Sequence, residues 1–244
     1  MAMPDEAAER CWTVDAPVLA VRQQAPIACR TISLSLPPVG GSAVEVRGLD
    51  PQAVPGSIRF DNGTVLTPTL RLTGTYDGHC LDLIEPPSPV EAGQGDLPAE
   101  LGAACPDPGG AAFTPEQRAA AIAYARAQTD LGQLWMSEHE RVFNVSFTGD
   151  LRQHQRAIRA IYRGPLCVVE APVSSADLEA IRQRLHADLE AQQIQVLESR
   201  KSQGKLHVLL VAAGQEEAER LRNHYGPHLA VTSWLRPASR PLAG

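Results

Sequence analysis

The amino-acid sequence predicts an α+β protein, with an N-terminal all-β barrel or sandwich followed by a C-terminal ferredoxin-like domain. The first observation is that residues 11–86 consist of short β-like runs joined by tight turns. The second is that residues 87–113 are rich in Pro, Gly and Ala, as linkers are. The third is the order strand, helix, strand, strand, helix, strand over residues 166–235. We therefore expect a small all-β domain at 11–86, a linker at 87–113 and an α+β domain at 114–237.

Turn residues define the strands of the N-terminal domain. Asp61-Asn62-Gly63 predicts one hairpin and Asp77-Gly78 predicts a second. Residues 27–36 alternate between apolar and polar side chains, as a strand with one buried face does. A five-stranded barrel of the oligonucleotide- or oligosaccharide-binding type is one candidate. Aromatic side chains for stacking bases are scarce here, with Phe60 and Tyr76 the main ones, so this shape does not predict nucleic-acid binding.

Capping residues mark the first helices of the α+β domain. A helix is expected to begin after Thr114, because Pro115 and Gln117 complete the sequence pattern of a capped start. Residues 141–169 then read as strand, cap, helix, turn and strand, with Asp150 as the N-cap.

Residues 166–235 carry the predicted ferredoxin-like core. Apolar side chains recur at steps of three and four residues from Leu178 to Leu189, which predicts an amphipathic helix. The order of the elements predicts a four-stranded antiparallel sheet with both helices on one face. The strand at 141–148 and the helix at 151–163 would extend or cover that sheet.

The helix expected at 151–163 carries the candidate site residues. Four arginines on one face are the candidate ligand-binding residues: Arg152, Arg156, Arg159 and Arg163. They would bind phosphate or carboxylate groups, or else form a solvated helix face. His154 lies near the apolar edge of this helix. It is either a histidine at the boundary of the core, with one ring nitrogen hydrogen-bonded, or a general acid, base or ligand. Asp150 could orient it but already serves as the helix cap.

The five cysteines are widely spaced and contain no CxxC pair, so no zinc site is predicted. If the protein is exported, Cys11–Cys29 and Cys80–Cys105 are the candidate disulfides. Cys167 lies in an apolar run, so we predict that it is a small, buried hydrophobic residue. We predict no metal and no cofactor, because the sequence lacks GxGxxG, GxxxxGK[ST], GxSxG and HExxH motifs.

The charge and hydropathy of the chain exclude some partners. The net charge of −6 and the pI of about 5.6 argue against a general nucleic-acid binder, which needs a basic surface. No run approaches the roughly 18 apolar residues of a membrane span. The acidic N-terminal residues are unlike a signal peptide, so we expect a cytoplasmic protein, or an exported one if a leader has been removed.

Several segments resemble an uncharacterised family of hypothetical proteins from actinobacteria. These segments are TGTYDG (73–78), CPDPGG (105–110), NVSFTGDLRQHQRAIRAIYRGPLCVV (144–169) and HYGPHLAVTSWLRP (224–237). The resemblance spans most of the chain, through turns, caps and strand edges, and it implies no activity, cofactor or partner. The segment ERLRNHYGPHLAVT (219–232) is also similar to the ferredoxin-like pro-domains of proteases.

We therefore predict a non-enzymatic binding or interaction protein, with a protein partner or a homo-oligomer, because the sequence lacks catalytic motifs. The sheets of ferredoxin-like folds often associate, although this is an analogy at the level of the fold. One alternative is an enzyme for a small anionic substrate, which requires His154 and an arginine in one concave pocket. The other alternative is a protease-inhibitor or pro-domain-like module.

Overall fold

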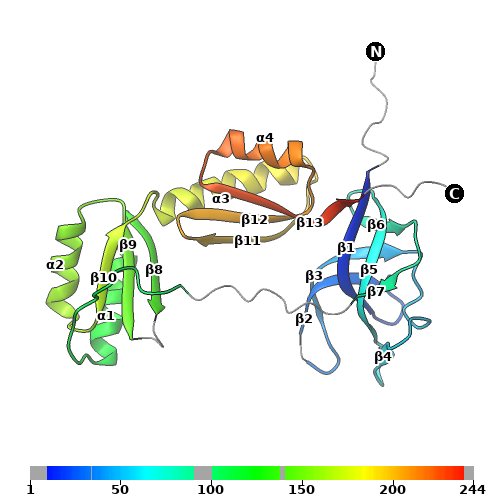
Figure 1. Cartoon of the computed structure of the whole chain (residues 1–244), viewed down its shortest axis with the longest axis horizontal. Helices are drawn as coiled ribbons and strands as arrows, with labels where there is room; N and C mark the ends of the chain where they lie inside the picture. The colour runs from blue at the N-terminus through cyan, green and yellow to red at the C-terminus, as the bar shows by residue number, and fades with distance from the viewer. Residues whose placement is uncertain (1–9, 34, 91–100, 138–140, 239–244) are drawn as a thin grey trace, which may run out of the picture.

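The computed structural model of this protein describes residues 10–33, 35–90, 101–137 and 141–238. Its elements form three groups that lie in a row (Figure 1). We call them the barrel (residues 11–89), the end module (101–170) and the C-terminal unit (175–238). The C-terminal unit lies between the other two groups, although it comes last in the chain.

Five strands form a closed barrel. They are β1 (Cys11–Ala20), β2 (Ile27–Ile32), β3 (Gly40–Arg47), β5 (Val65–Tyr76) and β6 (Cys80–Leu83). Their order is β1-β2-β3-β6-β5, and antiparallel pairing of β5 with β1 closes the ring. Of the predicted barrel or sandwich, the structure therefore shows the barrel. The predicted hairpin turns join β4 (Ile58–Arg59) to β5 and β5 to β6, and the short β7 (Ser88–Pro89) also pairs with β5.

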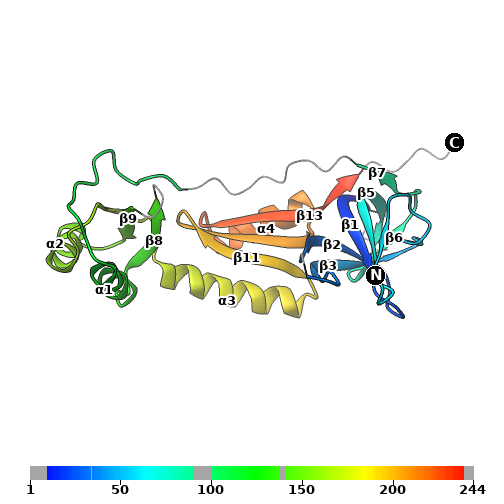
Figure 2. The same cartoon turned by 90° about the horizontal axis from the view of Figure 1, so that it is seen from below.

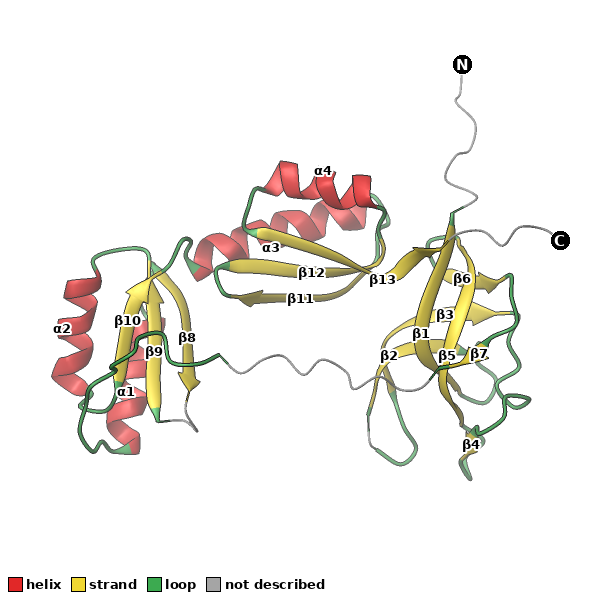
Figure 3. Ribbon diagram, in the orientation of Figure 1, coloured by secondary structure: helices red, strands yellow, loops and turns green. Residues whose placement is uncertain are grey.

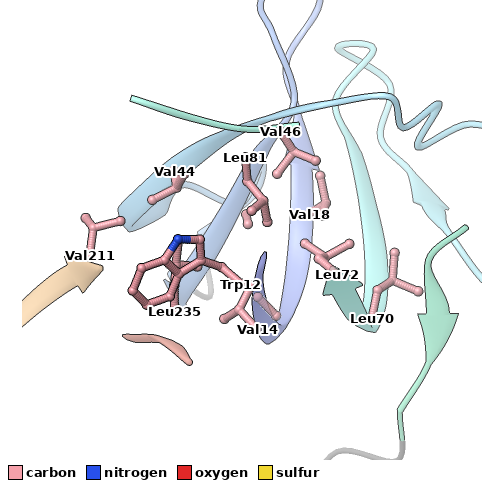
Figure 4. Packing of buried hydrophobic residues seen from close by; sticks show 12 residues of the cluster. Trp12, Val14, Val18, Val44, Val46, Leu70, Leu72, Leu81, Val211 and Leu235 are labelled. Carbon is pink, nitrogen blue, oxygen red and sulfur yellow. The ribbon is translucent and has the colours of Figure 1, made fainter. Parts of the chain in front are cut away.

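The barrel and the C-terminal unit share one sheet. The last strand, β13 (Leu229–Ala238), pairs in parallel with β12 (Lys205–Ala212). Its final residues pair with the start of β1, where Thr13 lies opposite Arg236. The barrel core also contains Val211 and Leu235, which pack near Trp12 (Figure 4). The first and last strands of the chain thus join these two groups through backbone pairing and a common hydrophobic core.

Two helices cover one face of the sheet in the C-terminal unit (Figure 2). They are α3 (Ser175–Ala191) and α4 (Gln215–Tyr225). The sheet order is β11-β12-β13, where β11 (Val196–Ser202) is antiparallel to β12. The apolar residues predicted along α3 are buried as expected, since Leu178, Leu185 and Leu189 pack against the β12 side chains Leu206 and Val208.

The end module is a separate three-stranded sheet with its own core (Figure 3). Its elements are α1 (Pro115–Arg126), β8 (Leu131–Ser137), β9 (Val142–Phe147), α2 (Leu151–Ile161) and β10 (Leu166–Glu170). Both predicted helix starts are confirmed. Thr114 forms a full capping box with Gln117, and the Asp150 carboxylate accepts hydrogen bonds from the backbone NH groups of Arg152 and Gln153.

The ferredoxin-like arrangement is not confirmed, because β10 lies in the wrong sheet for it. β10 pairs in parallel with β9 of the end module, with Leu166 opposite Phe143. The C-terminal unit therefore has three strands in this region instead of the predicted four. The physical reason is that β9, α2 and β10 form a local crossover, in which Leu166 and Val168 join the core under α1 and α2.

The cysteine predictions also need correction. The disulfide joins Cys105 to Cys167, across 62 residues of sequence. Cys29 and Cys80 are thiols buried in the barrel, so neither of the predicted pairs forms. Cys167 is buried as predicted, but it is bonded to Cys105 because residues 101–113 lie on the end module. None of the helices in the described ranges has the length and apolar character needed to cross a membrane.

Candidate functional site

His154 is held by two hydrogen bonds within the end module. Its Nε2 lies 2.9 Å from Oδ2 of Asp130, and its Nδ1 lies 3.0 Å from the hydroxyl of Tyr124. The imidazole stacks on the ring of Phe147, with centroids 3.8 Å apart and an angle of 13° between the planes. Its side chain is 8% exposed. Both ring nitrogens therefore have partners, which corrects the expectation of a single satisfied nitrogen.

Three elements and one glycine position this cluster. Asp130 directly precedes β8, Tyr124 lies on α1, and His154 lies in the second turn of α2. A Cβ atom at Gly149 would lie 2.2 Å from the Asp130 carboxylate, so the chain approaches Asp130 closely only because residue 149 is a glycine. Asp150, the partner considered from the sequence, instead caps α2.

The Asp130–His154–Tyr124 contact contains the residue types of an acid–base site. Its surroundings favour a structural role, because the imidazole is packed against Phe147 and is shielded from solvent. The three side chains join α1, α2 and the start of β8. This cluster therefore stabilises the packing of the two helices against the sheet of the end module.

The four arginines of α2 and its C-terminal turn do not converge on His154. Arg152, Arg156 and Arg163 are exposed. Arg159 is half-buried and donates hydrogen bonds to the carbonyl oxygens of Gly164, Pro108 and Gly109, at 2.7, 3.0 and 3.2 Å. This geometry gives no support to a shared anion pocket, because Arg159 and Arg156 donate to backbone carbonyl groups and Arg152, Arg156 and Arg163 are exposed.

A groove follows the junction between the barrel and the C-terminal unit. It consists of three adjoining cavities of about 660, 410 and 500 Å³. The first two share Arg10, Trp12 and Gly214, and the last two share Gly78 and residues 193–195. We call this the seam groove. Its walls come from β1, the β5–β6 turn, the α3–β11 connection and the start of α4.

The middle of the seam groove combines apolar and hydrogen-bonding groups. The half-buried side chains of Tyr76 and Ile194 contribute apolar surface, while Trp12 and Val211, 6% and 1% exposed, border the groove from the barrel core. The Tyr76 hydroxyl donates to the carbonyl of Gly78 at 2.7 Å and lies 3.2 Å from Oε1 of Gln195. Burial raises the pKa of Tyr76 to about 12, so its hydroxyl stays neutral and remains a donor at physiological pH.

Each section of the seam groove contains glutamate side chains. Glu216 and Glu219 line the first cavity, Glu217 lines the second, and Glu190 lines the third. Glu217 is paired with Arg220 at 2.6 Å. Among the described residues, Glu190, Glu216 and Glu219 take part in no ion pair. The groove therefore presents net negative charge beside an apolar floor, with Arg10 as its main cation.

Sequence reasoning missed the seam groove because its residues come from opposite ends of the chain. Trp12 and Val211 are about 200 positions apart, yet both pack in the barrel core. No local motif marks them. Within the described ranges, no three His, Cys, Asp or Glu side chains are placed to hold a metal ion. In comparisons with known proteins, the chain matches no family model, no curated protein and no solved structure.

Proposed function

We propose that this protein is a non-enzymatic binding protein that holds a segment of a protein partner in the seam groove. The observation that carries this proposal is the continuity of the three cavities, which share lining residues along one junction. Ligand sites commonly form where domains or sheets meet, because the junction leaves a concave surface between rigid walls.

The shape of the groove favours an extended peptide over a compact small molecule. The combined volume lies above the usual range for a small-molecule pocket, which is about 300–1,000 Å³. A strand-like segment could place alternate side chains on the half-buried side chains of Tyr76 and Ile194. Its backbone would find polar partners at Gln193 and Gln195, which also line the groove.

The charge of the groove favours a basic segment. Glu190, Glu216 and Glu219 would attract lysine or arginine side chains along its length. We therefore propose a partner segment in which apolar and basic residues alternate. His154 has no role in the proposed binding, because α2, which carries it, belongs to the end module and lies away from the barrel and the C-terminal unit (Figure 1).

The test is selection of eight-residue peptides from a display library on the full-length protein, followed by fluorescence anisotropy with the recovered peptides. We expect peptides rich in Lys, Arg and apolar residues. Substituting Glu190→Lys or Glu219→Lys should weaken their binding several-fold, because each change replaces an attractive charge by a repulsive one.

The matched control is Asp61→Lys, which makes the same change of charge on an exposed hairpin turn of the barrel. It should leave peptide affinity unchanged. The proposal is wrong if the library yields no binding peptide, or if all three substitutions weaken binding equally. The second result would indicate a general effect of net charge and not a site at the groove.

A further inference from the structure

A strap formed by residues 101–113 covers one face of the end-module sheet. Phe143 and Val145 of β9 belong to the core beneath α1 and α2. Asn144 lies between them in sequence and therefore points to the opposite face. The backbone NH of Ala104 donates to the Asn144 Oδ1 at 2.8 Å, which places the strap on that face. Asn144 is fully buried beneath it.

The second half of the strap is held by several noncovalent contacts. Arg159 donates to the carbonyl oxygens of Pro108 and Gly109 at 3.0 and 3.2 Å. The NH of Leu166 donates to Pro108 at 3.0 Å, and the NH of Ala111 donates to the carbonyl of Arg163 at 2.8 Å. These contacts do not involve the disulfide, so this half should stay in place without it.

The first half of the strap, residues 101–105, is held mainly by the Cys105–Cys167 disulfide. Two hydrogen bonds accompany it. One is the Ala104–Asn144 bond, and the other joins the Trp135 indole Nε1 to the carbonyl of Gly102 at 2.9 Å. Cys105 is half-buried whereas Cys167 is 1% exposed, so Cys105 is the more accessible of the two cysteines to a reductant.

A cavity of about 220 Å³ lies beside Leu101 of this half, at the joint between the end module and the C-terminal unit. Leu101 and Trp135 form part of its wall, and Ala171 lies in the connection that crosses the joint. The same joint contains a direct contact, in which the backbone NH of Gln203 donates to the Gln133 Oε1 at 2.7 Å. Leu101, at the start of the strap, thus forms part of the wall of a cavity that adjoins both groups.

We infer that the Cys105–Cys167 disulfide is a reversible redox latch, which a dithiol reductant opens to free residues 101–105 and remove Leu101 from the wall of the cavity at the joint. In the first step, a thiolate of the reductant attacks the Cys105 sulfur. The Cys105–Cys167 bond breaks, a mixed disulfide forms, and the Cys167 thiolate takes up a proton. The second thiolate of the reductant then displaces Cys105, which leaves as a thiol, and the reductant ends as a disulfide.

The freed half should leave the sheet because its remaining contacts are few. Ordering each backbone residue opposes binding through lost conformational entropy, and two hydrogen bonds exchange with water at little net gain. Water can replace Ala104 at Asn144 and Gly102 at Trp135. This inference does not depend on the proposed peptide binding, since the seam groove lies between the other two groups.

The test is hydrogen exchange, followed by mass spectrometry, of the full-length protein before and after treatment with reduced thioredoxin. Alkylation and intact-mass measurement should show two additional thiols after reduction, one from each cysteine of the latch. We expect several-fold faster exchange over residues 101–105 and a red shift in tryptophan fluorescence. Exchange around Phe143 and Ile158, which lie in the end-module core, should not change.

The variant Cys105→Ser should reproduce the reduced state without a reductant and should not respond to thioredoxin. The matched control is Cys80→Ser, because Cys80 is a buried thiol of the barrel and lies outside the latch. In that variant the response over 101–105 should persist. Three results would overturn the inference: no thiols released without denaturant, thiols released with unchanged exchange over 101–105, or loss of protection throughout the end module.

Discussion

At the scale of single residues, His154 shows how surroundings decide the role of a reactive side chain. The sequence placed it near the apolar edge of a helix, where both a structural and a catalytic role were open. In the folded protein it is stacked on Phe147 and bonded to Asp130 and Tyr124. Both ring nitrogens of this histidine are hydrogen-bonded and little of it is exposed to solvent. Such a histidine holds secondary-structure elements together and is poorly placed to exchange protons with a substrate.

Replacing His154 by alanine should therefore reduce the free energy of unfolding. The change removes a stacked ring and leaves Asp130 and Tyr124 without their partner, so we expect a loss of about 2–4 kcal/mol. Urea unfolding monitored by circular dichroism measures it. The control is Arg156→Ala on the same helix, which should change stability by less than about 0.5 kcal/mol because that side chain is exposed. Equal stability of the two variants would contradict a structural role for His154.

At the scale of elements, charged side chains connect neighbouring strands and helices. Asp15 of β1 accepts hydrogen bonds from Arg71 of β5 at 2.9 Å and from Arg236 of β13 at 3.0 Å. It thereby joins two barrel strands to the last strand of the chain. On the C-terminal unit, Glu179 of α3 pairs with Lys201 of β11 at 3.4 Å. A hydrogen bond from Arg182 lowers the pKa of Glu179 to about 2.

The Asp15 contact should depend on pH. The hydrogen bond from Arg71 is the largest cause that holds the pKa of Asp15 below its usual value of 3.8; partial burial opposes it, and Arg236 lowers the pKa further. Because the folded pKa is the lower one, the stabilisation is complete above pH 3.8 and is lost as the pH falls through the folded value.

We therefore expect Asp15→Asn to be less stable than the wild type near neutral pH, by at most about 1 kcal/mol because the pair is partly solvated. The difference should shrink as the pH is lowered below about 4. Thermal unfolding at a series of pH values measures it, with Asp61→Asn on an exposed turn as the control. A difference between Asp15→Asn and wild type that stays constant down to acidic pH would argue against the ion pair.

At the scale of the whole molecule, the shared core should make the barrel and the C-terminal unit unfold together. Leu235 and Val211 of the C-terminal unit belong to the same buried cluster as Trp12 and Leu72 of the barrel. The end module has a separate sheet and a separate core. The cooperative unit is therefore discontinuous in sequence, because the end module is inserted between its two parts.

Leu235→Ala tests this cooperativity. Leu235 is fully buried, so the substitution should cost about 2–5 kcal/mol. Native-state hydrogen exchange should then show equal loss of protection in β5 of the barrel and β12 of the C-terminal unit. Protection of β9 in the end module should be unaffected. If β12 alone exchanged faster, the barrel would be an independent unit.

The sequence by itself determined where most elements begin and end. Thr114, Asp150 and the hairpin turns act on backbone groups within a few residues, so their effect can be read locally. The same signals predicted a barrel or a sandwich, and only the pairing of β5 with β1 shows that the strands close into a barrel. By contrast, the C-terminal βαββαβ order is compatible with more than one sheet, and order alone did not specify the partner of β10.

Only the tertiary structure decided the contacts between distant segments. The pairing of β10 with β9, the join of β1 to β13, the Cys105–Cys167 disulfide and the partners of His154 all belong to this class. Each depends on which apolar faces are buried together, and many strand partners satisfy the same local pattern of alternation. The seam groove exists for the same reason, since it forms where the two ends of the chain meet.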